Sequence, residues 1–204
     1  MKKVTACLLT AFLVACGGGA ADKKDADTTA VSIKKDSDVA RAKQEGKTWI
    51  ENFRIFRDAV YQKNKEKVKL FFDFPVMNTN NEIWYLVNDS SISDPDKIRP
   101  FTEKNFDWYY DKLFPEDFIK AMLKIKTEEL YKTGEVQTPS LSSKDSVSYV
   151  IYATYDKSNN SLSLNMAFNS MLPEGEDGGE YNVLYFFVIL PDGQLKFKEI
   201  RIAG

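Results

Sequence analysis

A strict period-two alternation in the last third of this 204-residue chain is the feature that most constrains its fold. Between residues 161 and 170, apolar side chains occupy every second position: Leu162, Leu164, Met166 and Phe168. This pattern is typical of a strand with one face in a core and the other in water. The segments 146–155, 181–190 and 194–203 are rich in the β-branched and aromatic residues that favour strands. The sequence therefore predicts four strands that follow one another as antiparallel neighbours.

Two local features refine this predicted sheet. The segment 181–190 is apolar on both faces, which predicts a central strand that is covered on both sides. The tripeptide at 191–193, Pro-Asp-Gly, is a tight-turn signal that returns the chain into the last strand. In that strand the apolar positions change parity between Phe197 and Ile200, and a β-bulge near Lys198-Glu199 accounts for the change.

The first half of the chain carries the helical patterns. Apolar side chains in 44–62 fall on one helical face, and Asn64 can end this helix and cap a second one at 65–72. Two short segments rich in apolar and aromatic residues, 74–77 and 83–87, then predict strands joined by a turn.

A second helical region is expected at 102–126. Pro115 interrupts its aromatic stripe and can restart the helix as a first-turn proline, and Gly134 sets the latest possible end. Helices followed by a meander of strands predict an α+β fold.

The segment 59–68, AVYQKNKEKV, is similar to the first helix, short polar turn and second helix of the nuclear-transport-factor-two-like superfamily, which includes the ketosteroid isomerases. The element order of residues 37–203 agrees with the same resemblance. It implies a cone-like, strongly bent antiparallel sheet of about six strands packed on two to four helices. The alternative is a different α+β sheet with helices on one face.

The cone-like fold that this resemblance implies has a pocket between its curved sheet and its helices. An apolar pocket with a few polar groups is a common ligand site. The candidate ligand-binding residues are Trp49, Phe53, Phe56, Tyr109, Tyr149, Tyr152, Tyr155 and Tyr185. The alternative is that these aromatic side chains form the core, as stripes at helical spacing commonly do.

Asp73 is the candidate catalytic residue, because it is a carboxylate set inside an apolar run, FFDFP at 71–75. If it pointed inward, desolvation would raise its pKa and suit it to proton transfer. Isomerases of the resembled superfamily use an Asp base with a Tyr or acid donor, but no motif flanks Asp73 to map that role. The alternative is a surface residue that caps the junction between a helix and a strand.

Histidine is absent from the chain, which excludes Ser-His-Asp and Cys-His nucleophile pairs and imidazole zinc ligands. The loops 89–96 and 174–180 carry oxygen ligands of the kind that calcium takes, but neither has the spacing of an EF-hand. Solvated loops are the expected interpretation, and we expect no metal and no cofactor. A non-enzymatic domain is favoured, with a lyase or isomerase that uses Asp and Tyr as the alternative.

The N-terminal residues predict the cellular location of the chain. Two lysines and an apolar stretch that ends at Val14 form a leader of signal-peptide length. The run Leu13-Val14-Ala15-Cys16 resembles the lipobox of bacterial lipoproteins. The resemblance implies that the signal peptide, residues 1–15, is removed and that Cys16 is acylated on its sulfur and its amine, which anchors the chain in a membrane. An ordinary signal peptide with a chance cysteine is the alternative.

The residues after Cys16 predict a tether and a location. Residues 16–36 are small and charged, which predicts a flexible tether ahead of one domain at 37–204. Gly17, in place of Asp, resembles the choice of lipoproteins that reach the outer membrane; the periplasmic or surface face stays open. Asp27-Thr28-Thr29 resembles an O-glycosylation sequon, with a plain linker as the alternative.

Charge and cysteine content limit the kinds of partner that the mature chain can have. Without Lys2 and Lys3 it has 26 basic residues against 30 acidic ones, a formal charge near −4. It therefore lacks the basic footprint that nucleic-acid binding needs. With Cys7 removed and Cys16 acylated, it would also have no disulfide in an oxidising compartment. We expect membrane lipid as one partner, through Cys16, and a small apolar ligand or an envelope protein as the other.

Overall fold

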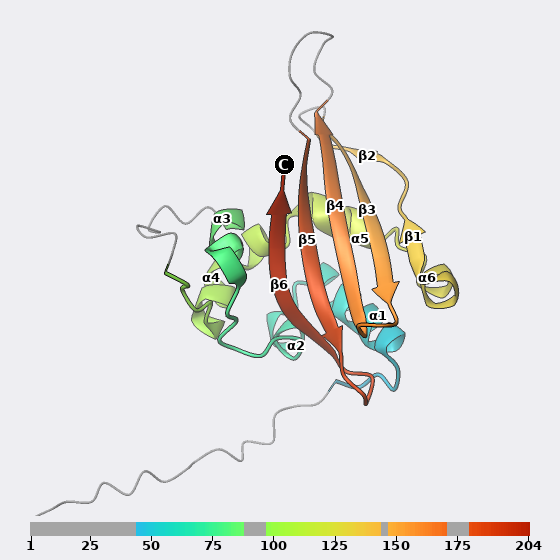
Figure 1. Ribbon diagram of the computed structural model, residues 1–204, viewed down its shortest axis with the longest axis horizontal. Coiled ribbons are helices and arrows are strands. Elements are labelled where there is room, and N and C mark those ends of the chain that lie inside the picture. The colour runs from blue at the N-terminus through green and yellow to red at the C-terminus, as the bar shows by residue number, and fades with distance from the viewer. Residues whose placement is uncertain (1–43, 88–96, 144–146, 171–179) are drawn as a thin grey trace, which may run out of the picture. The chain divides into compact units, whose positions relative to one another are not determined.

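The computed structural model describes residues 44–87, 97–143, 147–170 and 180–204 (Figure 1). The helices come first in the chain, and the strands follow them. The helical elements are α1 (Trp49–Tyr61), α2 (Lys65–Lys69), the 3-10 turn η1 (Thr79–Asn81), α3 (Glu82–Leu86), α4 (Glu103–Leu113), α5 (Glu116–Met122) and α6 (Thr127–Thr133). The strands are β1 (Glu135–Gln137), β2 (Leu141–Ser142), β3 (Val147–Asp156), β4 (Ser161–Ser170), β5 (Glu180–Ile189) and β6 (Leu195–Ala203).

The six strands form one antiparallel sheet, so the chain has the predicted α+β fold with a curved, open sheet. The strand order is β1-β3-β4-β5-β6, and β2 also pairs with β3. The four long strands are consecutive antiparallel neighbours, as the alternating pattern predicts. In Figure 1 the sheet faces the viewer, and the helices lie behind and beside it.

The register of β5 and β6 confirms the predicted β-bulge. Phe186 pairs with Glu199, whereas Phe187 pairs with Phe197, so Lys198 is the extra residue on β6. The bulge returns Ile200 to the same face as Phe197, which keeps apolar side chains pointing at the helices on both sides of it.

The helices differ from the predicted ones mainly at their ends. α1 begins at Trp49 instead of residue 44, because Thr48 caps it in a capping box with Glu51. The predicted helix 102–126 is divided into α4 and α5 at Pro115, which lies at the N-cap of α5. A further helix, α6, follows and ends at Gly134, whose positive φ of 84° suits a helix C-terminus.

The two strands predicted at 74–77 and 83–87 are wrong. Only Val76 forms a bridge, with Phe101, and residues 82–86 form the short helix α3. Asn80 and Asn81 both have positive φ and turn the chain into this helix. Short apolar runs fit a strand or one buried helical turn equally well, which explains the error. β1 and β2 were not predicted from the sequence, because they are too short to carry a pattern.

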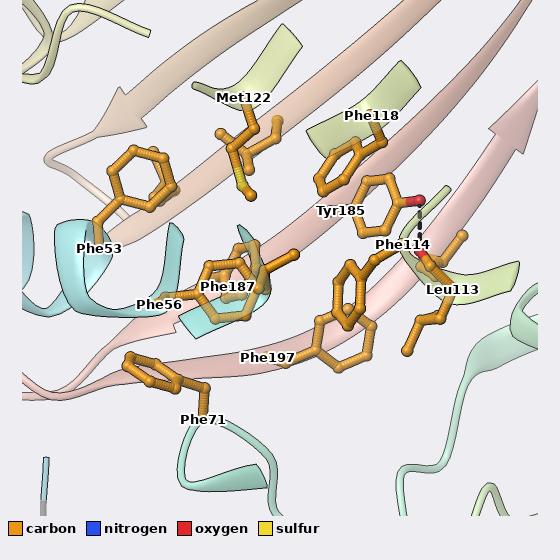
Figure 2. Close-up of a cluster of buried hydrophobic side chains, with 14 of the residues drawn as sticks. Phe53, Phe56, Phe71, Leu113, Phe114, Phe118, Met122, Tyr185, Phe187 and Phe197 are labelled. Atoms are coloured by element: carbon orange, nitrogen blue, oxygen red, sulfur yellow. Dashed lines mark hydrogen bonds between the residues drawn. The ribbon is translucent and has the colours of Figure 1, made fainter. Parts of the chain in front are cut away.

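Aromatic side chains fill the space between the sheet and the helices (Figure 2). Phe56 packs edge-on against Phe187 with ring centroids 5.1 Å apart, and Phe118 stacks on Tyr185 at 4.2 Å. The Tyr185 hydroxyl donates to the carbonyl of Leu113 at 2.8 Å, so this buried polar atom is satisfied. The face of the sheet that points at the helices is therefore a packed core.

Only one face of β5 belongs to this core. Val183, Tyr185 and Phe187 are buried in it, whereas Leu184 and Phe186 on the opposite face are only partly buried and lie outside it. Among the described residues, the prediction that β5 is covered on both faces is therefore not met.

Polar groups of other segments cover the free edge of β6. The Ile200 N–H donates to Asn78 Oδ1 at 2.7 Å, and Asn78 Nδ2 donates to the Ile200 carbonyl at 3.1 Å. Gln44 repeats this pattern with Leu195, whose N–H donates at 2.8 Å and whose carbonyl accepts at 2.6 Å. Between these two positions, the Phe197 N–H donates to the Phe71 carbonyl, in the loop after α2, at 2.7 Å. At these positions the edge is blocked against pairing with another strand.

Candidate functional site

A hollow at the end of the sheet where α1 begins is the candidate site that contains two of the predicted aromatic residues, Trp49 and Tyr155; we call it the rim pocket. It has a volume of about 640 Å³. Its lining comes from the start of α1, from α6, and from the turns that join β3 to β4 and β5 to β6. The lining residues are Lys47, Thr48, Trp49, Tyr131, Tyr155, Asn160, Ile189, Leu190, Pro191, Asp192 and Gly193.

Hydrogen bonds fix the backbone that forms the rim pocket. The Glu51 carboxylate accepts from the N–H groups of Lys47 and Thr48, and these bonds lower its pKa. The buried Asn52 side chain donates to the carbonyl of Gly193 at 2.8 Å, which ties the turn after β5 to the start of α1. Gly193 has a positive φ of 80°, and a Cβ there would lie 3.0 Å from the carbonyl oxygen of Lys47. The close approach of the two segments therefore needs glycine at this position.

Three aromatic rings contribute to the apolar part of the rim pocket, together with Ile189, Leu190 and Pro191. Trp49 lies between Tyr155, at a centroid distance of 4.5 Å, and Tyr131, at 5.9 Å. Trp49 is 8% exposed and Tyr131 is 51% exposed, so the tyrosine presents most of the accessible ring surface. A ring held against its neighbours in this way offers a flat apolar surface at low entropic cost.

Polar groups surround these rings. Lys47, Asn160 and Asp192 line the same hollow and offer an ammonium, an amide and a carboxylate. At the end of β3, ahead of the turn that carries Asn160, the Asp156 carboxylate accepts from Ser158 and Asn159, and these bonds lower its pKa to about 2. The side chains of the lining hold no thiol and no imidazole. The arrangement is therefore suited to binding a molecule that has both an apolar face and a polar edge.

The eight aromatic candidates are distributed over four environments. Trp49 and Tyr155 meet in the rim pocket. Tyr152 is 42% exposed on the outer face of the sheet, where it contributes to another hollow, and Tyr109 is half-buried against Trp84. The other four are buried in the core: Phe53, Phe56, Tyr149 and Tyr185.

Tyr131 is the aromatic rim-pocket residue that was not predicted from the sequence. It lies on α6, a helix that the sequence analysis did not predict. The run Thr127–Thr133 has a good helix composition and ends at Gly134, which is the signal that could have located it.

Asp73 lies at the surface. Its side chain is 59% exposed, and Lys196 Nζ lies 3.2 Å from its Oδ1. The burial on which its role as a base depends is absent. The structure has a different hydrogen-bonded pair of an Asp and a Tyr: the Tyr149 hydroxyl donates to Asp117 Oδ1 at 3.1 Å. Burial and then the Asp117 hydrogen bond raise the pKa of Tyr149.

Several features predicted from the sequence fall outside the described residues. Cys16, the tether 16–36 and the loops 89–96 and 174–179 lie outside. In the described part of the chain, no group of three or more Asp, Glu, Cys or His residues could hold a metal ion. No helix in the same part is long and apolar enough to cross a membrane. Comparisons with protein-family models, with curated proteins and with solved structures found no match to this chain.

Proposed function

We propose that this chain is a lipid-anchored lipoprotein of the outer membrane whose domain binds a small molecule in the rim pocket without transforming it. The observation that carries the binding role is the aromatic group of Trp49, Tyr131 and Tyr155 with polar side chains around it. The lipobox at Leu13–Cys16 carries the anchoring role. Membership of the nuclear-transport-factor-two-like superfamily stays a prediction.

The chemistry of the rim pocket defines the class of ligand. A wholly apolar ligand would displace water from the polar side chains of the lining without replacing its hydrogen bonds. A flat molecule with hydroxyl groups at its edge would instead stack on Tyr131 and exchange hydrogen bonds with those side chains. A sugar ring has this form, so a glycan is the ligand class that the pocket fits best.

The proposed anchor would keep the pocket close to the membrane. The pocket includes Lys47, about thirty residues after Cys16, and the tether predicted from the sequence would reach roughly 30 Å over that length. A ligand that is part of the envelope would thus lie within reach of the domain. A partner protein of the envelope is the other occupant that this placement allows.

Mass spectrometry tests the anchor. The mature N-terminal peptide should begin at Cys16 and carry the mass of its acyl chains, and Cys16→Ser should yield an unacylated precursor. A mature chain that begins elsewhere without acyl mass would refute this part of the proposal.

A matched pair of variants tests the pocket. Tyr131 and Tyr85 are both 51% exposed, but Tyr85 does not line the rim pocket. A panel of mono- and oligosaccharides is titrated by NMR or calorimetry into the wild-type chain, Tyr131→Ala and Tyr85→Ala. Loss of a stacking ring should weaken binding at least about tenfold in Tyr131→Ala and leave Tyr85→Ala unchanged. Equal affinities in the two variants would exclude the rim pocket as the site.

A lyase or isomerase is the second candidate function, and the Asp117–Tyr149 hydrogen bond favours it. The two groups could relay a proton, with Lys120 Nζ 3.7 Å from Asp117 Oδ1. Turnover of a bound ligand that Asp117→Asn abolishes without a change in affinity would establish catalysis. Ligand recovered unchanged from the wild-type chain would support the non-catalytic proposal.

A further inference from the structure

A separate hollow lies at the free edge of β6, the edge strand of the sheet in Figure 1; we call it the edge pocket. The segment after α2 crosses this edge and contacts β6 twice. The Phe197 N–H donates to the Phe71 carbonyl, and Asn78 exchanges two hydrogen bonds with Ile200. The segment takes seven residue steps from 71 to 78, whereas β6 takes three from 197 to 200, so the segment bows away from the strand between these contacts. The hollow at this place has a volume of about 330 Å³.

Two lysines and one carboxylate line the edge pocket: Lys196, Lys198 and Asp73. The Lys196 ammonium donates to the Leu70 carbonyl at 3.0 Å and lies 3.2 Å from Asp73 Oδ1, and only 14% of the Lys196 side chain is exposed. An ammonium has three N–H groups, so these two contacts leave one N–H for a ligand. Asp73, the candidate base of the sequence, therefore serves to hold a cation in place at the wall of the pocket.

The β-bulge supplies the second cation of the edge pocket. Lys198 is the extra residue of the bulge, so it has no cross-strand neighbour on β5, and bulges commonly redirect a side chain in this way. Its side chain is exposed, and within the described part of the chain its ammonium makes no ion pair. Two ammonium groups and one carboxylate give the pocket a net charge of +1, whereas the whole chain has a formal charge of −2.

Apolar side chains form much of the remaining lining. Pro75 and Met77 contribute from the crossing segment, and Val188 and Leu190 contribute from β5 and the turn after it. Met77 is 56% exposed, and its flexible thioether can adapt to the shape of a bound molecule. Ligand sites commonly have volumes of about 300–1,000 Å³, so a pocket of about 330 Å³ suits a small molecule.

We propose that the edge pocket is a binding site for a small organic monoanion, a carboxylate that carries a short apolar tail. The carboxylate accepts charge-assisted hydrogen bonds from the third N–H of Lys196 and from Lys198, and the tail packs against Met77 and Val188. A neutral molecule binds less well, because it displaces water from Lys196 and offers no charged acceptor in return. A dianion such as phosphate is disfavoured, because Asp73 repels its second charge.

The edge pocket is distinct from the rim pocket. Leu190 is the one residue that lines both hollows. The rim pocket presents aromatic rings for stacking, whereas the edge pocket presents two ammonium groups beside aliphatic side chains. The two sites therefore select ligands of different chemistry, and each can be tested without the other.

Hexanoate is the probe for this site. It is titrated into the full chain in a nonionic detergent, and binding is followed by the NMR signals of methyl groups. The methyl signals of Met77 and Val188 should shift and saturate. Hexanol has a tail of the same length without the charge, and phosphate has charge without the tail, so each should bind at least about tenfold more weakly.

A matched pair of lysines locates the site. Lys198 and Lys104 are both exposed, but Lys104 lies on α4 and does not line the edge pocket. Lys198→Ala should raise the Kd for hexanoate at least about tenfold, and Lys104→Ala should leave it unchanged. Lys198→Arg keeps the charge and should retain most of the affinity. Methyl spectra that match the wild type in the absence of ligand show that the variants have folded.

Two more variants complete the test. Met77→Glu adds a carboxylate that repels the ligand and should abolish hexanoate binding, whereas Tyr131→Ala, in the rim pocket, should bind hexanoate as the wild type does. Equal binding of hexanoate and hexanol, equal affinities of Lys198→Ala and Lys104→Ala, or no saturable shift in the wild type would overturn the proposal. Loss of hexanoate binding in Tyr131→Ala would also overturn it and would assign the probe to the rim pocket.

Discussion

The edge of β6 yields the sharpest prediction, because two backbone groups there depend on one side chain. Asn78 is 1% exposed and Ile200 is fully buried, so water has no ready access to the bonds that join them. Asn78→Ala removes both bonds, to the N–H at 2.7 Å and to the carbonyl at 3.1 Å. A buried polar group left without a partner costs about 1–3 kcal/mol, so we expect a loss of about 2–4 kcal/mol in the free energy of unfolding.

Urea denaturation of the soluble chain that begins at Gly17 measures this loss, with the m-value checked for constancy. Gln137→Ala, on the exposed strand β1, is the control and should change stability by less than about 0.5 kcal/mol. Asn78→Asp adds a pH test. Its buried carboxyl would have a raised pKa, so the variant should be most stable at low pH, where the protonated group can donate. Its deficit should then grow as the pH rises above about 4.

A loss below about 0.5 kcal/mol for Asn78→Ala would refute the reasoning, since it would mean that water replaces the amide. A pH-independent deficit of Asn78→Asp would refute the assignment of the donated bond to the Ile200 carbonyl.

Three further predictions test other parts of the structure. The pKa of Asp156, lowered to about 2 by hydrogen bonds from its turn, means that its stabilising contribution is present above about pH 4 and lost as the pH falls towards 2. Thermal midpoints of the wild type and Asp156→Asn should therefore converge over that range, and a gap of constant size would contradict the assignment. Tyr185→Phe should cost about 1–2 kcal/mol in urea denaturation, because the buried carbonyl of Leu113 loses its donor; a neutral effect would show that another group replaces it. Gly193→Ala should cost about 1–2 kcal/mol by the same assay, from positive φ and the contact with Lys47, and a stabilised variant would contradict the close approach.

The sheet could be predicted from sequence because its determinants are local. Alternation in β4 reports one buried face directly, and the parity change between Phe197 and Ile200 located the bulge at Lys198. The turn at 191–193 follows from residues with restricted or permissive backbone angles. These features depend on residues near one another in sequence, so a single sequence contains them.

The errors fall where tertiary contacts decide the outcome. The segment 83–87 has a strand-like composition, yet as α3 it buries Ile83 and Trp84 against the core and leaves Tyr85 exposed. Its approach also places Asn78 against the edge of β6. The region that was predicted to add two strands to the sheet instead covers the edge of β6. Nothing local distinguishes these alternatives, because both bury the same apolar residues.

The candidate site was predictable only in part for the same reason. Aromatic composition identified Trp49 and Tyr155, but the turn after β5 that completes the pocket is tied to the start of α1 by Asn52, a residue without a sequence signal. Asn52 accepts from the Gly46 N–H at 3.0 Å and donates to the Gly193 carbonyl at 2.8 Å, and it does not line the rim pocket. Asn52→Ala should therefore weaken ligand binding and stability together, whereas Tyr131→Ala should weaken binding alone. Calorimetry and urea denaturation on both variants measure the two effects. Full affinity in a destabilised Asn52→Ala chain would contradict this. It would mean that the turn after β5 keeps its position without the Asn52–Gly193 hydrogen bond, and that contacts among the lining residues are enough to form the pocket.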